Sequence, residues 1–415
     1  MSIIKSKDLT LMQAIKSTNG TVTKISNLVT NCCAKLMVYF RPSPTYIGEF
    51  GFDWIKGDDL DDLLSYVSGD LFPSDLGMIR IIDKDIVGEY PNQTNRNYPG
   101  TFQVNADEYK KLCQTFDQKQ HNMHSSGLPL YNTPVMTIYP NKSVELELKM
   151  HIMQPAKGIH LSYNSDLFKL TPANNLSAPL GLSKLNLKIE CLKSFNEDQY
   201  IKLIAGGKFV GQLKILANED LYEVKIVLVD VKTNFGVIDK IGHHAGMEDL
   251  LKRYLKQAYI KPIFESLILD ATNPIFTRNN SISGYLSKTG SVMQAELDTL
   301  LYNKYDTTKD YRDFYRIYFI DENDVSNGLY GQAADILSKS VFISTKGLGD
   351  STPAHELFHA MGLYHTFDIN SQFVYEKYET DNIMDYSDIG AKQIHVNRLY
   401  HWQWKVLQDA SEKID

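Results

Sequence analysis

The stretch that most constrains the fold is HELFHAMGLYH, residues 355–365, which has the spacing HExxHxxGxxH. On an α-helix, His355 and His359 lie about one turn apart, so both imidazoles face the same way and can share one tetrahedral zinc ion. The helix can end at Gly362, because glycine tolerates the left-handed backbone of such an end. The chain can then turn back and bring in His365. This pattern predicts three nitrogen ligands and one open position, as in a catalytic rather than a structural zinc site.

The residue after the first histidine adds a second chemical group to this helix. Glu356 can reach a metal-bound water, for which its carboxylate can act as a general base. The alternative interpretation is a polar helix whose histidines are ordinary surface or core residues. That alternative would bury several unpaired imidazoles close together, which costs free energy.

A methionine-containing segment, DNIMDY at residues 381–386, follows the histidines. Alone, Met384 would be an ordinary core methionine, since methionine commonly fills gaps in cores. However, HExxHxxGxxH followed by a Met-containing turn resembles the signature of metzincin metallopeptidases. HELFHAMGLYHTF followed by NIMDYSD is most similar to the pappalysin-like branch. The resemblance covers about residues 245–415. It implies that Met384 forms the hydrophobic floor under the zinc and that Tyr386 swings on and off the metal.

The resemblance implies a zinc-dependent endopeptidase that acts on a protein or peptide substrate. A zinc-activated water would attack the peptide bond, Glu356 would be the general base, and zinc and Tyr386 would stabilise the oxyanion. Two alternatives stay open. One is an exported bacterial effector toxin that uses the same site on a host or rival-cell target and is held in check by an inhibitor or immunity protein. The other is a binding protein with an inactive protease-like domain, against which the intact Glu356 and Tyr386 argue.

Charge and cysteine usage narrow the class of protein. The chain of 415 residues has a formal net charge of −7, which gives no support for a nucleic-acid partner. No apolar run is long enough to cross a bilayer, and residues 1–16 lack the apolar region of a signal peptide. We therefore expect synthesis in the cytoplasm and, for an exported protein, a route without a cleaved signal. None of the four cysteines follows Cys191, so the predicted zinc-bearing part has no disulfide, which suits a reducing compartment.

The apolar pattern predicts an α+β multidomain chain with three parts. Residues 1–125 form a mixed α/β region of unknown role, with a strand near 35–40 and a helix near 107–116. Residues 126–240 form an immunoglobulin-like β-sandwich, because short alternating strands recur between turn signals. These strands are expected at 143–153, 185–191, 209–216 and 222–229. Residues 241–415 form the metzincin-like α/β domain, after a glycine-containing, polar stretch near 232–246.

Within the last part, helices are expected at 250–258, 291–302 and 392–410, and strands at 314–320 and 340–344. By resemblance, SVFIS at 340–344 is the edge strand above the cleft, whose free amides can pair with a substrate backbone. The alternative is an ordinary inner strand. Ser351 or Thr352 can cap the histidine-bearing helix, and Pro353 suits its first turn.

Several neighbouring residues have more than one interpretation. Asp368 could hydrogen-bond a ligand histidine, although we expect it at the surface. His395 and His401 are expected to pack or to face solvent in the C-terminal helix, which Trp402 and Trp404 pin to the core. The upstream residues could instead form a prosegment that blocks the zinc, with Cys113 or an aspartate as the blocking ligand.

Overall fold

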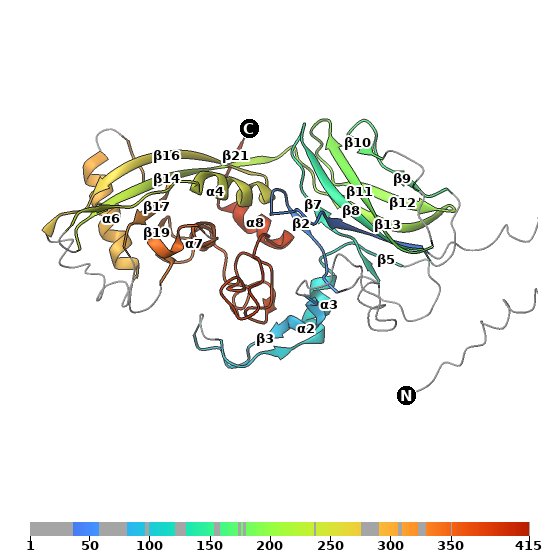
Figure 1. The fold of residues 1–415 in the computed structure, drawn as a ribbon, viewed down its shortest axis with the longest axis horizontal. Helices are drawn as coiled ribbons and strands as arrows, with labels where there is room; N and C mark the ends of the chain where they lie inside the picture. Colours follow the sequence, from blue (N-terminus) through green and yellow to red (C-terminus); the bar gives the residue numbers. More distant parts are fainter. Residues whose placement is uncertain are drawn as a thin grey trace, which may run out of the picture.

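The computed structural model describes residues 36–57, 81–95, 99–120, 130–152, 158–172, 176, 180–235, 238–274, 290–305, 309–322, 329–349 and 351–414. Over these residues the chain is a mixed α+β protein, as predicted. Two groups of strands lie at opposite ends of the molecule (Figure 1). The elements α2 (Asp83–Ile86), β3 (Val87–Glu89) and α3 (Ala106–Cys113) lie beside the segment that precedes α8 (His401–Asp409). Cys32 and Cys33 are outside the described ranges.

Two sheets form one end of the molecule. The first has the order β1-β8-β11-β10 and is antiparallel throughout. It comprises β1 (Leu36–Pro42), β8 (Ser143–Ile152), β11 (Gly181–Cys191) and β10 (Phe168–Thr171). The second has the order β2-β7-β13-β12-β9. It comprises β2 (Phe52–Asp53), β7 (Val135–Met136), β13 (Lys208–Ile215), β12 (Gln199–Ala205) and β9 (His160–Ser162).

The alternation seen in the sequence explains how these two sheets pack. In β8, Val144 and Leu146 are buried while Glu145 is exposed, so one face of the strand is apolar. The apolar face shares one core with Leu203 and Leu213 of the second sheet. Burying both apolar faces against one another removes them from water, which is the main gain in free energy for such a layer. The immunoglobulin-like topology stays a prediction.

A larger sheet lies at the other end. Among the described strands its order is β15-β14-β17-β19-β18, and β16 and β21 also pair with β14. Strands β14, β16, β17 and β19 run parallel, whereas β18 is antiparallel to β19 and forms an edge. The strands are β14 (Leu221–Thr233), β15 (Lys240–Ile241), β16 (Ile260–Asp270), β17 (Tyr315–Ile320), β18 (Gly331–Ala333), β19 (Ser340–Ser344) and β21 (Glu412–Ile414).

Helices cover both faces of this larger sheet. Ile226 and Leu228 of β14 belong to one core with α4 (Met247–Leu255) and α7 (Thr352–Ala360). Val227 and Val229 point the other way, into a core with α6 (Gly290–Tyr305). A strand buried on both faces needs a nearly continuous apolar run, and this explains the sequence of β14. The short helices η2 (Lys256–Ala258) and η3 (Thr345–Gly347) follow α4 and β19.

The predicted boundary at residue 240 is wrong. Residues 222–229 lie in β14, which belongs to the larger sheet and pairs with β16 and β17. The change from one sheet system to the other therefore falls between Ile215, where β13 ends, and Leu221, where β14 begins. The prediction failed because β14 was grouped with the preceding alternating strands, although its run of consecutive apolar residues is typical of a parallel strand.

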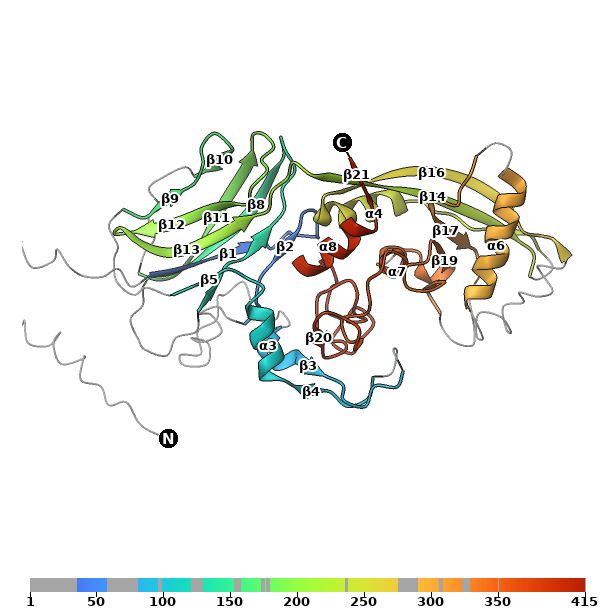
Figure 2. The ribbon, with the colours of Figure 1, turned by 180° about the vertical axis from the view of Figure 1, so that it is seen from behind.

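Residues 1–125 are not a separate unit where the structure describes them. Strands β1 and β2 belong to the two sandwich sheets. The elements α2 (Asp83–Ile86), β3 (Val87–Glu89), β4 (Gln103–Val104) and α3 (Ala106–Cys113) instead join the histidine-bearing part. Strand β3 pairs with β20 (Val374–Tyr375), beside which it lies in Figure 2. Strand β5 (Gln118–Lys119) pairs with β6 (Tyr131–Asn132). The helix expected near 107–116 is α3.

The predicted C-terminal helix is shorter than expected. Residues 392–400 are irregular, and α8 spans only His401–Asp409. The backbone before α8 forms hydrogen bonds with the Met-containing segment in place of helical ones. Asn397 N–H donates to the Asp381 carbonyl (3.1 Å), and Arg398 forms a β-bridge with Asn382. Trp402 and Trp404 are buried and fix α8 to the core, as predicted. In the ranges that the structure describes, no helix is long and apolar enough to cross a membrane.

Candidate metal centre

Local signals in the sequence determine where α7 begins and ends. Pro353 occupies its first turn, where a missing N–H leaves no hydrogen bond unmade. Ser351 stands at the N-cap position, but its hydroxyl bonds to Asp388 Oδ2 (3.0 Å) and not to the helix backbone. The helix ends at Ala360, and Gly362, two residues later, has a φ of +109°, the left-handed backbone that the motif predicted. A Cβ at this position would lie 2.8 Å from Leu337 Cδ2, so a side chain meets both strain and crowding.

The three histidines of the motif converge in the structure. The side chains of His355, His359 and His365 are buried, with exposed fractions of 5%, 8% and 7%. The Nε2 atom of His359 lies 3.1 Å from that of His355 and 3.0 Å from that of His365. Tetrahedral zinc with bonds of 2.0–2.1 Å would place its nitrogen ligands about 3.3 Å apart. The three buried histidines are therefore close enough together to bind one metal ion.

Backbone carbonyls set the orientation of two of these rings. His355 Nδ1 lies 2.7 Å from the Ile383 carbonyl, and His359 Nδ1 lies 2.7 Å from the Leu363 carbonyl. A carbonyl can only accept, so each Nδ1 carries the proton and each Nε2 has its lone pair directed to the common centre. Such outer hydrogen bonds are typical of histidines that bind metals.

Glu356 lies at the junction of α7 and the edge strand. Its Oε2 accepts a hydrogen bond from Ala333 N–H of β18 (2.8 Å). The neighbouring backbone groups, Ala334 N–H and the Tyr330 carbonyl, bond instead to β19. Glycine at position 331 permits this close approach, because a Cβ there would lie 3.1 Å from Glu356 Cγ. The carboxylate thus has a fixed place between the helix and the strand.

The expected edge strand was wrongly assigned. SVFIS is β19, which lies between β17 and β18 and is buried throughout, so the inner-strand alternative is correct. The edge is β18, of which only Gly331–Ala333 are in regular strand conformation. A strand this short carries no apolar periodicity, so the sequence offered no signal for it.

A cleft of about 260 Å³ opens beside the histidines. Its walls include the β18 edge, two of the histidines and residues that follow them along the chain. The lining includes Ala333, Glu356, His359, His365, Asp368 and Tyr386. Two of the candidate metal ligands, a carboxylate and a phenol therefore share one accessible space.

The structure also brings the Met384 turn (residues 381–386) to the histidines. The Tyr386 ring stacks on His355, with centroids 5.4 Å apart, and lies 4.8 Å from the His365 ring. Met384 is fully buried in the core that contains Leu357 of α7. The roles assigned to these two residues by resemblance remain predictions.

The surrounding residues correct several expectations. Asp368 is not at the surface, because it is 1% exposed and accepts hydrogen bonds from the backbone and side chain of Asn370 (2.8 Å each).

His395 is exposed but lies outside α8. His401 packs against Phe116 and contacts Asp53 through Nδ1 (2.7 Å). Cys113 is a buried core residue of α3. In the described part of the chain, the histidine triad is the cluster with metal-binding geometry.

The two buried aspartates of the Met384 turn, Asp381 and Asp385, were not identified from the sequence. Asp385 accepts hydrogen bonds from the Tyr378, Thr380 and Tyr386 backbone and from the Thr380 and Ser387 hydroxyls. Burial nevertheless raises the pKa of Asp385. For Asp381, burial alone would raise the pKa, but Arg398 and Lys56 together hold it below its usual value. The aspartates that flank NIM in the sequence were the available signal.

Comparison with the models of known protein families and with curated proteins found no match for this chain.

Proposed function

We propose that the protein is a zinc-dependent endopeptidase with a metzincin-like histidine-bearing domain. The observation that supports this most directly is the convergence of three buried Nε2 atoms next to a cleft that Glu356 also lines. An inactive binding protein would have no need to keep this arrangement together.

The donor set fits zinc. Three imidazole ligands suit a borderline metal ion better than calcium or magnesium, which prefer oxygen. The Ile383 and Leu363 carbonyls fix two of the ring tautomers in advance. Bound here, zinc would polarise a carbonyl and lower the pKa of water towards neutrality.

The protein side chains supply the proton transfers. Glu356 faces the cleft from α7 and can take a proton from the attacking water and pass it to the leaving amine. Tyr386 lies against two of the histidine rings, so its hydroxyl is the candidate donor to the developing oxyanion. The short edge strand β18 lies along the same cleft, and its backbone offers a place for an extended substrate to pair.

The test uses the full chain, a mixed peptide library and mass spectrometry. Wild-type protein should bind one zinc ion and cleave peptides, and chelation should stop cleavage. Glu356→Gln should retain zinc and lose cleavage, while a matched exchange at half-buried Glu108 of α3 should change neither. Absence of zinc binding, or wild-type cleavage by the Glu356→Gln variant, would contradict the proposal.

A further inference from the structure

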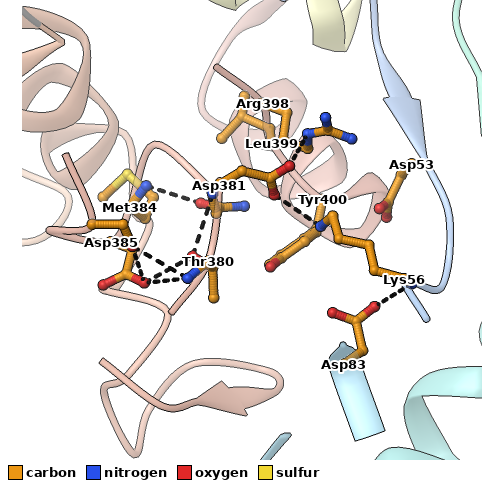
Figure 3. Close-up of polar contacts among 12 residues, drawn as sticks. Asp53, Lys56, Asp83, Thr380, Asp381, Met384, Asp385, Arg398, Leu399 and Tyr400 are labelled. Carbon is orange, nitrogen blue, oxygen red and sulfur yellow. Dashed lines mark hydrogen bonds and ion pairs between the residues drawn. The ribbon is translucent and has the colours of Figure 1, made fainter. Parts of the chain in front are cut away.

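A buried ion-pair cluster lies at the start of the Met384 turn (Figure 3). Asp381 Oδ1 lies 2.8 Å from Lys56 Nζ, and its Oδ2 lies 2.6 Å from Arg398 Nε. All three side chains are buried, with exposed fractions of 8%, 5% and 7%. One carboxylate therefore joins two cations that are far apart in the sequence.

This cluster is connected to a candidate metal ligand through the backbone. The Arg398 carbonyl accepts the N–H of Ile383 (2.9 Å), and the Ile383 carbonyl faces His355 Nδ1 (2.7 Å). The Asp381 carbonyl in turn accepts Asn397 N–H (3.1 Å). Movement of Asp381 or Arg398 would therefore move the carbonyl that orients the His355 ring.

Both cations depend on one N-terminal segment, residues 52–56, which we call the β2 arm. Lys56 belongs to the arm, and its backbone N–H donates to Asp83 Oδ2 (2.7 Å). The Arg398 guanidinium lies 4.2 Å from the centroid of the Trp54 ring, which is also part of the arm. The arm begins with strand β2 of the sandwich, so it physically links the sandwich to the turn.

Because the charges in this link are buried, the link is sensitive to the loss of either ion-pair partner. A buried carboxylate is tolerated when opposite charges compensate it, and removing one partner leaves a charge that is costly to bury. Without Lys56, Asp381 would gain free energy by moving towards water, and the turn would move with it. Ile383 N–H donates to the carbonyl of Arg398, the ion-pair partner of Asp381, so such movement would reach Ile383.

We propose that Lys56 is a positioning residue of the metal centre, acting through Asp381 and the Ile383 carbonyl on His355. This inference rests on the zinc site proposed above. It assigns the N-terminal region a supporting role in metal binding and not the role of a blocking prosegment.

The experiment compares full-length wild type with Lys56→Met and Lys56→Arg. The matched control is Lys184→Met, which removes a partly buried lysine from a pair with Glu147 (3.2 Å) in the sandwich. Zinc affinity is measured by competition with a chromophoric chelator, and the visible spectrum of the cobalt-loaded protein reports ligand geometry. Near-ultraviolet circular dichroism checks that each variant is folded.

We expect Lys56→Met to bind zinc about tenfold to a hundredfold more weakly, the range found for residues that orient metal ligands. Its cobalt spectrum should change, whereas Lys56→Arg should recover most of the affinity and Lys184→Met should resemble wild type. Wild-type affinity and spectrum in folded Lys56→Met would overturn the inference, as would equal losses in the Met and Arg variants.

If Lys56→Met does not fold, Asp381→Asn takes its place, because it keeps the shape and removes the charge that both cations contact. Unchanged zinc affinity in folded Asp381→Asn would then overturn the inference. Failure of the wild type itself to bind zinc would refute the proposed function, and so the two failures are distinguishable.

Discussion

Asp83 provides a quantitative test of the buried charges beside the β2 arm. Its Oδ2 accepts the Lys56 N–H, while its Oδ1 has no hydrogen-bond partner among the described residues. Burial raises its pKa from 3.8 to about 7, against the attraction of Lys56 and with added repulsion from Asp53 and Asp381. Below about pH 7 the folded protein thus favours the neutral acid, and the substitution Asp83→Asn mimics that form.

The sign of the pH dependence follows from the raised pKa. Between the unfolded pKa near 3.8 and the folded pKa of about 7, the folded state holds a proton that the unfolded state releases. The stabilising contribution is therefore complete below about pH 4 and is lost as the pH rises to 7. At 1.36 kcal/mol per pKa unit, the loss is roughly 4 kcal/mol at most. Asp83→Asn removes this loss, so we expect it to exceed wild type by about 2–4 kcal/mol at pH 8.

The assay is urea unfolding of the metal-free full chain from pH 4.5 to 8.5, followed by circular dichroism. The difference between variant and wild type should be small at pH 4.5 and grow with rising pH, since all other titrations are shared. Asp166→Asn, at an exposed turn of the sandwich, serves as control and should show no such trend. A difference that stays constant with pH, or an Asp83→Asn protein less stable than wild type at pH 8, would refute the reasoning.

Three further outcomes are expected. His359→Ala should lose zinc, because it removes the nitrogen that lies within 3.1 Å of both other ligand atoms; full occupancy by elemental analysis would contradict the ligand assignment. Tyr386→Phe should keep zinc but lower turnover by roughly tenfold to a thousandfold, measured on a peptide found in the library, and an unchanged rate would remove it from the mechanism. Gly362→Ala should reduce the unfolding free energy by about 1–3 kcal/mol through its positive φ, with the contact to Leu337 adding to this; a thermal melt equal to wild type would show that the helix end adapts.

The metal-ligand geometry could be predicted because it depends on short-range spacing. His355 and His359 share a helical face, and Gly362 turns the chain towards His365, all within eleven consecutive residues. The same locality explains why α4, α6 and β17 were recognised from their apolar patterns.

Features that depend on distant parts of the chain could not be predicted in this way. The pairing of β3 with β20, and of Lys56 with Asp381, joins segments separated by most of the sequence. Neither partner has a pattern that identifies the other. The expected surface position of Asp368 failed for a related reason, because its burial depends on how the loop after His365 folds back.

The pairing of β3 with β20 has a consequence for biosynthesis. A ribosome makes residues 87–89 long before Val374 and Tyr375, so β3 can pair early with β4 on one edge, while its other edge has no partner until β20 has been made. The cleft, whose lining includes Asp368 and Tyr386, likewise can form only when the C-terminal segment has emerged. We therefore expect a prematurely terminated chain to lack the proposed hydrolytic activity.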